Sequence, residues 1–199
     1  MSIGMDAMID VRLTFCGYLL GAAGLRHLWC DLPYVGVDAR AHFDYMKEPH
    51  SEGWYVRQAY LQNREVTQYL ASLPYAVAFQ VAFRAIGECY LVLGIFASLS
   101  ESANSNGIIV STAESGRPED FEFVGFDVSW PNPGFHSFLY QPGFLTAQPE
   151  SVRDLWASRL NRYGLFPTLE LAREFRIECQ RVLPGEMDIM GVAMHRIKG

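Results

Sequence analysis

The sequence has few of the features that mark a secreted, disulfide-bonded protein. Its four cysteines are scattered without a C-x-x-C pair, and three of them lie in strongly apolar segments. This pattern is typical of reduced, buried thiols rather than of a disulfide framework. The apolar run from Leu13 to Leu25 follows Asp6 and Asp10, whereas a signal peptide begins with a positively charged region. We therefore expect a cytoplasmic protein.

The sequence also lacks an apolar run that is both long and free of charged residues. The other long run, Ala71 to Leu99, contains Gln80, Arg84 and Glu88 at positions that would lie deep in lipid. A charged side chain there costs about 2.5 kcal/mol or more. We therefore expect no membrane span.

Positive charge is scarce, and its distribution is uneven. The chain has 16 Lys and Arg against 22 Asp and Glu, for a net charge of −6. Residues 101–149 carry one basic side chain and six acidic ones, so nearly all of the excess lies in this segment. An acidic segment repels phosphate and steers a basic protein towards it. Nucleic-acid binding is therefore not expected.

No familiar catalytic or metal-binding motif is present. Gly17, Gly21 and Gly24 match neither G-x-G-x-x-G nor the P-loop pattern, and close backbone packing accounts for them better. The densest group of possible metal ligands lacks H-E-x-x-H or a comparable spacing, and we interpret it as a solvated loop. It comprises Asp38, His42, Asp44, Glu48, His50 and Glu52. We expect no catalytic residue, metal or cofactor.

Two further groups contain residue types that are used in hydrolysis. They are His27 with Cys30, and Ser129, Ser137 and His136 with Asp127. No G-x-S-x-G elbow frames either serine, and sequence neighbours rarely supply both the reach and the electropositive setting that a catalytic thiolate needs. We interpret the first group as a core cysteine beside a partly buried histidine. Asp127 and His136 are interpreted as structural polar residues near a turn.

Hydrophobic periodicity predicts both helices and strands in the first half of the chain. Apolar side chains recur about one helical turn apart from Trp54 to Leu70, which predicts a helix. Ala76 to Arg84 alternates large apolar residues with small or polar ones, and we favour a strand there. The competing interpretation is a helix whose Gln80, Arg84 and Glu88 form a polar stripe. Residues 11–37 fit neither pattern clearly, and residues 38–53 suggest a surface connection.

The second half gives clearer signals. Strands are predicted at Tyr90 to Leu99, covered on both faces, at Glu122 to Trp130, and at Met187 to Ile197. Phe135 to Tyr140 is predicted to return as a hairpin partner after a Pro-rich turn. Ser151 and Thr168 are predicted to cap two helices. Their expected buried faces are Val152, Leu155, Trp156, Leu160 and Tyr163 for the first, and Leu171, Phe175, Cys179 and Val182 for the second. The whole chain, 1–199, is therefore predicted to be a single α+β domain, with helices packed against a mostly antiparallel sheet.

The acidic segment is also rich in aromatic residues, which is the combination expected of a protein-binding surface. Rings anchor a partner, while charges steer and select it. The alternative is that the rings belong to the core and the acids to a solvated rim. The residues that we assign to partner binding are Glu114, Glu119, Asp120, Glu122, Trp130, Phe135 and Tyr140.

The C-terminal third resembles small bacterial immunity proteins of polymorphic toxin systems. The resemblance covers roughly 75 residues. It rests on the strand Val124 to Val128, the segment Leu160 to Phe166, taken as a helix end, and the closing strand Met190 to Ile197. It implies a single-domain inhibitor that binds one cognate toxin and has no chemistry of its own.

The leading hypothesis is therefore a cytoplasmic immunity protein that neutralises a basic toxin. One alternative is a small enzyme or ligand-binding domain whose site is assembled from distant residues, with the Asp38 to Glu52 loop contributing. Another is a structural protein that associates with itself through aromatic surface residues. The sequence leaves the oligomeric state open.

Overall fold

The chain folds around one antiparallel sheet. A computed structural model describes residues 14–22, 24–35, 50–63, 70, 72–97, 121–130, 137–140, 144–183, 185 and 187–195. Within these residues it forms four strands and four helices. In chain order they are β1 (Thr14–Ala22), α1 (Glu52–Gln62), α2 (Leu73–Ala85), β2 (Tyr90–Ala97), β3 (Phe121–Ser129), α4 (Glu150–Ala157), α5 (Leu169–Val182) and β4 (Asp188–His195). The α+β prediction is confirmed.

The strands are arranged in the order β1-β2-β4-β3, and every neighbouring pair is antiparallel. β2 is an inner strand whose middle residues, Val92 to Ile95, are buried. This confirms the predicted central strand, and β3 and β4 confirm the two later ones. β1 lies in the glycine-rich segment that the sequence left unassigned.

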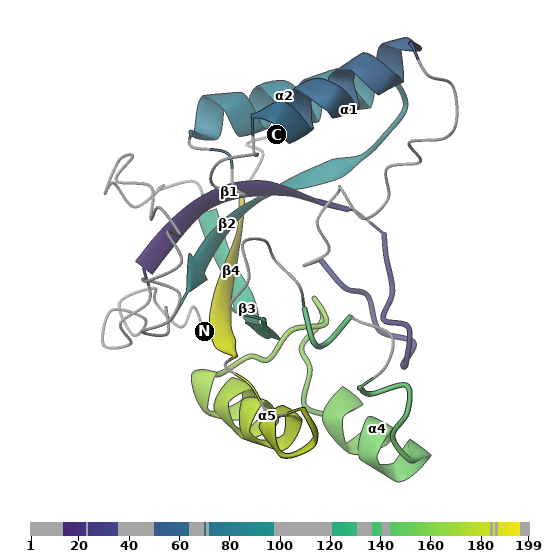
Figure 1. Cartoon of the computed structure of the whole chain (residues 1–199), viewed down its shortest axis with the longest axis vertical. Helices are drawn as coiled ribbons and strands as arrows, with labels where there is room; N and C mark the ends of the chain where they lie inside the picture. The colour runs from purple at the N-terminus through teal and green to yellow at the C-terminus, as the bar shows by residue number, and fades with distance from the viewer. Residues whose placement is uncertain are drawn as a thin grey trace.

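Helices cover both faces of the sheet, with α1 and α2 side by side across one face and α4 and α5 at the other (Figure 1). Alternate strand residues therefore enter two separate cores. The core under α1 and α2 includes Tyr18, Leu20, Tyr60, Phe83 and Val92. The larger core, on the side of α4 and α5, includes Leu19, Ile95, Phe126, Phe166 and Phe175.

The strand prediction for Ala76 to Arg84 is wrong, because this segment lies within α2. Pro74 occupies the first turn of the helix, where a missing N–H costs nothing. The small residues between the large ones are alanines, which favour a helix over a strand. Phe79 and Phe83, one turn apart, pack edge-on against Tyr60 of α1. The alternation of large and small residues in this segment therefore does not reflect a strand.

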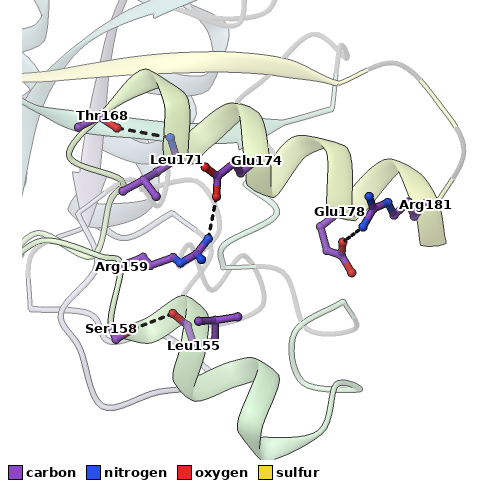
Figure 2. A network of polar contacts seen from close by, with 8 residues as sticks. All are labelled: Leu155, Ser158, Arg159, Thr168, Leu171, Glu174, Glu178 and Arg181. Atoms are coloured by element: carbon purple, nitrogen blue, oxygen red, sulfur yellow. Dashed lines mark hydrogen bonds and ion pairs between the residues drawn. The ribbon is translucent and has the colours of Figure 1, made fainter.

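The last two helices lie side by side, and one ion pair links the end of α4 to α5 (Figure 2). The Thr168 hydroxyl accepts a hydrogen bond from the Leu171 N–H, which confirms the predicted cap of α5. Arg159, just after α4, forms an ion pair with Glu174 of α5 at 2.8 Å. Its guanidinium also lies 4.8 Å from the centre of the Trp156 ring. Since this pair is partly exposed, it contributes about 1 kcal/mol or less.

The predicted boundaries and faces of these helices need correction. α4 begins after Pro149, so Ser151 lies inside the helix rather than at its cap, and Leu155 is 49% exposed. The helix ends at Ala157, where the Ser158 hydroxyl donates to the Leu155 carbonyl, and the predicted face therefore stops short of Leu160 and Tyr163. In α5, Phe175 and Cys179 are buried as predicted. Val182 is 54% exposed because it is the last residue of the helix.

Both outer strands have hydrogen-bonding partners on their outward edges. On β1, Tyr18 exchanges two backbone hydrogen bonds with Leu70, of 2.9 and 2.7 Å. On β3, Phe126 does the same with Phe166, and the Phe138 N–H donates to the Val128 carbonyl at 2.8 Å.

The predicted hairpin is reduced to one bridge in the described part of the segment. Ser137 pairs with Ser129, and residues 138–140 then form a turn. The ladder partner of β3 is β4, from the far end of the chain. A strand pairing of this kind leaves no local sequence signal, so adjacency in sequence favoured the wrong partner.

Candidate functional site

The residues predicted to bind a partner are not gathered at one point in the described structure. Glu122 lies near the start of β3, and Trp130 follows its end. The length of the strand, roughly 25 Å, separates them. Outside the described residues lie Glu114, Glu119, Asp120 and Phe135, as do most of the Asp38 to Glu52 loop and His136.

Glu122 is engaged in weak contacts at the surface. Its Oε1 lies 3.6 Å from Nη2 of Arg162 and 3.4 Å from the Tyr163 hydroxyl, which donates to it. Side-chain exposure is 30% for Glu122 and 75% for Arg162. Exposed pairs of this kind contribute about 0 to 1 kcal/mol.

Trp130 and Tyr140 are half-buried and take part in the packing of the fold. The Trp130 ring lies 4.8 Å from that of Phe138, centre to centre. Tyr140 stacks on Tyr34 at 5.3 Å with an interplanar angle of 11°. Much of the surface of both rings is thus used internally, which is the alternative that the sequence left open.

Asp127 forms the centre of a buried polar cluster. Its side chain has no exposed surface, and that of Tyr34 has none either. The Tyr34 hydroxyl donates to Oδ2 of Asp127, and the Val128 N–H donates to Oδ1 at 2.6 Å. The Ser137 side chain and the Leu139 backbone also form hydrogen bonds with this carboxyl. Four donors from three segments therefore converge on one carboxyl group.

His27 and Trp29 extend the cluster. The His27 ring lies between two backbone carbonyls, with Nδ1 3.1 Å from the Leu139 oxygen and Nε2 2.9 Å from the Gly164 oxygen. Trp29 Nε1 donates to the same Leu139 oxygen at 2.5 Å. The His27 ring also packs against Tyr34, 4.7 Å between ring centres. Local sequence offers no hint of these contacts, because more than a hundred residues separate His27 and Trp29 from their carbonyl partners.

Burial determines the protonation of this cluster. It raises the pKa of Asp127 to about 6, although hydrogen bonds from Ser137 and Tyr34 oppose the shift. Burial, together with the nearby Asp127 charge, raises the pKa of Tyr34 well above its usual range. The pKa of His27 is lowered by burial against the opposing effect of the two carbonyls.

Ser137 and Asp127 place a hydroxyl group beside a carboxyl group, but Ser137 is 5% exposed and Asp127 has no exposed surface, so this pair is closed to a substrate. The Ser129 hydroxyl donates to the Trp130 carbonyl, and both His27 nitrogens face carbonyl oxygens. Burial raises the pKa of Cys30, which disfavours the thiolate that nucleophilic attack requires. Since the carboxyl group of Asp127 is sealed from solvent, we assign the cluster a structural role.

The segment after α4 owes its shape to Asn161 and Gly164. Asn161 Nδ2 donates to the Val124 carbonyl at 2.7 Å, and Oδ1 accepts from the N–H groups of Tyr163 at 2.9 Å and Leu165 at 3.3 Å. Gly164 has φ of +71°, a conformation that glycine adopts without strain. The stretch Leu160 to Phe166, predicted as a helix end, is thus a loop fastened to β3.

Asn161→Ala is expected to reduce the free energy of unfolding by about 2 kcal/mol, because three partly buried hydrogen bonds are lost. Asn63→Ala is the matched control, since its exposed side chain makes a single bond to the Ala59 carbonyl. It should cost less than about 1 kcal/mol. Urea unfolding of both variants measures the difference. Equal losses would show that Asn161 does not hold the loop.

An apolar stripe runs along the outer surface of α2. Its exposed residues lie on one face and are Pro74, Tyr75, Ala78, Val81, Arg84 and Ala85. Tyr75 is 60% exposed and Val81 is 63% exposed. Arg84, at one flank, is the only charged residue among them. The stripe could not be recognised from the sequence, because the strand prediction placed Val81 on the core face.

Neither a metal site nor a membrane span is found in the described ranges. No group of three or more His, Cys, Asp or Glu side chains in them is placed to hold a metal ion. None of the helices in these ranges combines the length and apolar character needed to cross a membrane.

Comparison with known proteins does not identify a relative. No family model matches the chain, and neither the curated proteins nor the solved structures contain a significant match. The resemblance of the C-terminal third to immunity proteins therefore stays a prediction.

Proposed function

We propose that the chain is a protein-binding domain of the immunity type, which neutralises a basic toxin by occupying its surface. The observation that carries the proposal is the exposed apolar stripe on α2. A helix face of this kind is normally covered, and exposed apolar patches mark sites of protein contact. The proposal assigns no chemistry to the chain, in keeping with the sealed cluster around Asp127.

The stripe has the form of a helix ridge that fits a groove on a partner. Ala78, Val81 and Ala85 follow one another at helical spacing, with Tyr75 at their edge. Such positions serve as anchors where a helix lies in an apolar groove. Tyrosine is a frequent anchor because it buries a large area with few rotatable bonds.

Charge favours a basic partner. The net charge of −6 gives an attractive field for a cationic protein, and its excess lies in residues 101–149. In the proposal, Glu119, Asp120 and Glu122 accelerate the encounter, whereas the α2 stripe holds the complex. Electrostatics then govern association, and apolar contact governs dissociation.

Capture of the tagged chain from its native host, with identification of what co-purifies, gives the first test. The proposal expects one stoichiometric basic protein that is toxic when expressed alone. Neutralising Glu119, Asp120 and Glu122 together should slow its association roughly tenfold and flatten the salt dependence. Val81→Glu should instead accelerate dissociation. Binding kinetics by surface plasmon resonance separate the two effects.

Ile177→Glu on α5 is the matched control for the α2 substitution. Ile177 is 50% exposed, and α5 lies on the other side of the sheet. The Ile177→Glu substitution should leave the association and dissociation rate constants unchanged. If the captured partner is not toxic, the immunity role fails. If Val81→Glu and Ile177→Glu have equal effects, the stripe is not the binding surface.

A further inference from the structure

The α2 stripe carries almost no charge on a molecule that is acidic as a whole. Ala76 and Phe83 are the buried side of α2, so the stripe is on the side turned away from the sheet (Figure 1). Arg84 is the single charged residue of this helix, whereas α5 carries three Glu and three Arg among its 14 residues. Two copies of a chain with a net charge of −6 repel one another, but the stripe adds nothing to that repulsion.

The order of large and small side chains along the stripe is that of a surface that fits itself. Two copies of a helix can pack antiparallel across a two-fold axis, which brings together positions equally far from the axis. An axis midway along the stripe, between positions 79 and 80, places Ala78 opposite Val81 of a second copy and Pro74 opposite Ala85. Each larger side chain on the seam then meets an alanine, which is the alternation that closely packed helices need.

The flanks of the stripe agree with the same arrangement. Tyr75 lies on one flank, within one turn of the level of Ala82 of a second copy, so that the ring again faces a small residue. Arg84 lies on the opposite flank. The two copies of Arg84 are about 13 Å apart along the helices, at 1.5 Å per residue. This separation exceeds the distance over which exposed charges interact at physiological salt, so the pairing brings no like-charge penalty.

We propose that the α2 stripe of one copy packs antiparallel against the stripe of a second copy, so that the chain forms a two-fold symmetric dimer. Each copy then covers the apolar surface of the other, which the single chain leaves in water. A toxin that uses the stripe has to displace the second copy. This regulation of toxin binding rests on the proposed function, whereas the dimer itself does not.

The dimer should be weak and reversible. A standard stable interface buries about 1,600 Å² in total, and one pair of helix faces supplies less than that. Salt should strengthen the association, because it screens the repulsion between two acidic chains and leaves apolar contact intact. Association with a basic toxin should have the opposite salt dependence, which distinguishes the two uses of the stripe.

Sedimentation of the unmodified chain at increasing concentration tests the dimer. A monomer that converts to a dimer is expected, and a chain that stays monomeric up to millimolar concentration would overturn the proposal. Val81→Ala should weaken the dimer roughly tenfold or more, because methyl groups are lost at two equivalent positions. Ile177→Ala is the matched control, since it shortens a residue of similar exposure on α5 and should leave the dimer unchanged.

A mixing experiment tests the antiparallel register. Ala78→Val should weaken the dimer, because it places one valine against Val81 of the second copy. An equal mixture of Ala78→Val and Val81→Ala chains should associate more tightly than either variant does with itself, because every valine of the first chain then faces an alanine of the second. Both substitutions are at exposed positions, so both variants should fold. A mixture no tighter than its components would refute the register.

The captured toxin tests the regulation separately. Its addition should convert dimers into complexes that hold one copy of each protein. A complex in which the toxin binds an intact dimer would contradict the use of the stripe for toxin binding and would leave the dimer standing. A chain that dimerises but captures no toxic partner would likewise remove the proposed function alone. A chain that binds a toxin through the stripe but never dimerises would remove only the dimer.

Discussion

Gly164→Ala is expected to reduce the free energy of unfolding by about 3 kcal/mol or more. A Cβ at this position would lie 2.0 Å from the Pro33 carbonyl oxygen and 2.5 Å from Nε2 of His27. Neither neighbour can withdraw freely, because one is backbone and the other is held between two carbonyls. The positive φ of residue 164 adds strain for any residue with a side chain. Thermal and urea unfolding measure the loss.

Gly87→Ala separates the cost of the steric contact from the cost of the positive φ. Gly87 has a similar positive φ of +85°, but a Cβ there would meet nothing within 4 Å. It should therefore lose only about 1 to 2 kcal/mol, which is the cost of the left-handed backbone. Equal losses in the two variants would mean that the contact with Pro33 and His27 contributes nothing.

Phe175→Ala is expected to cost about 3 to 5 kcal/mol. The Phe175 ring has no exposed surface and lies 5.0 Å from the Trp156 ring, 5.2 Å from the Phe166 ring and 5.7 Å from the Phe144 ring. Phe175 lies in α5, Trp156 lies in α4, Phe166 lies in the segment after α4, and Phe144 lies in the turn before α4. Removing the ring leaves a cavity that rigid neighbours cannot fill, so the transition to the unfolded state should shift to lower denaturant.

Ile177→Ala provides the comparison on the same helix. Ile177 is 50% exposed, so its truncation should cost less than about 1 kcal/mol. Because helix propensity rises slightly from Ile to Ala, the change could be close to zero. If Phe175→Ala were as mild as this control, the aromatic cluster would not be a cooperative part of the core.

The elements that sequence predicted well are those whose signals are local. The cap of α5 follows from the threonine at position 168, and the burial of Phe175 and Cys179 follows from helical spacing. β2 and β4 follow from short apolar runs of strand length. In each case the residues that determine the element are its own, so no knowledge of the partner was needed.

The sequence predictions fail where contacts with distant residues determine the secondary structure. Ala76 to Arg84 alternates in size, but Tyr60 selects the face of α2 that is buried, and it lies in another helix. The segment Leu160 to Phe166 becomes a loop because β3 supplies its partners. Neither influence can be recognised from the spacing within the segment.

The candidate site shows the same division. Asp127 was recognised as a structural polar residue near a turn, yet Tyr34, which donates to Asp127, lies 93 residues away in sequence. The predicted binding residues were chosen by their charge and aromatic character. Those properties do not reveal that Trp130 packs on Phe138 or that Tyr140 stacks on Tyr34.

The outward edges of the sheet limit how this protein can assemble. The backbone of Tyr18 on β1 and that of Phe126 and Val128 on β3 already bond to other parts of the same chain. At these positions an incoming peptide finds no unpaired backbone group to bond to, so the addition of a strand is obstructed. Strand addition is the route to both β-augmented complexes and cross-β fibrils. Any contact at these positions would then involve side chains rather than the backbone.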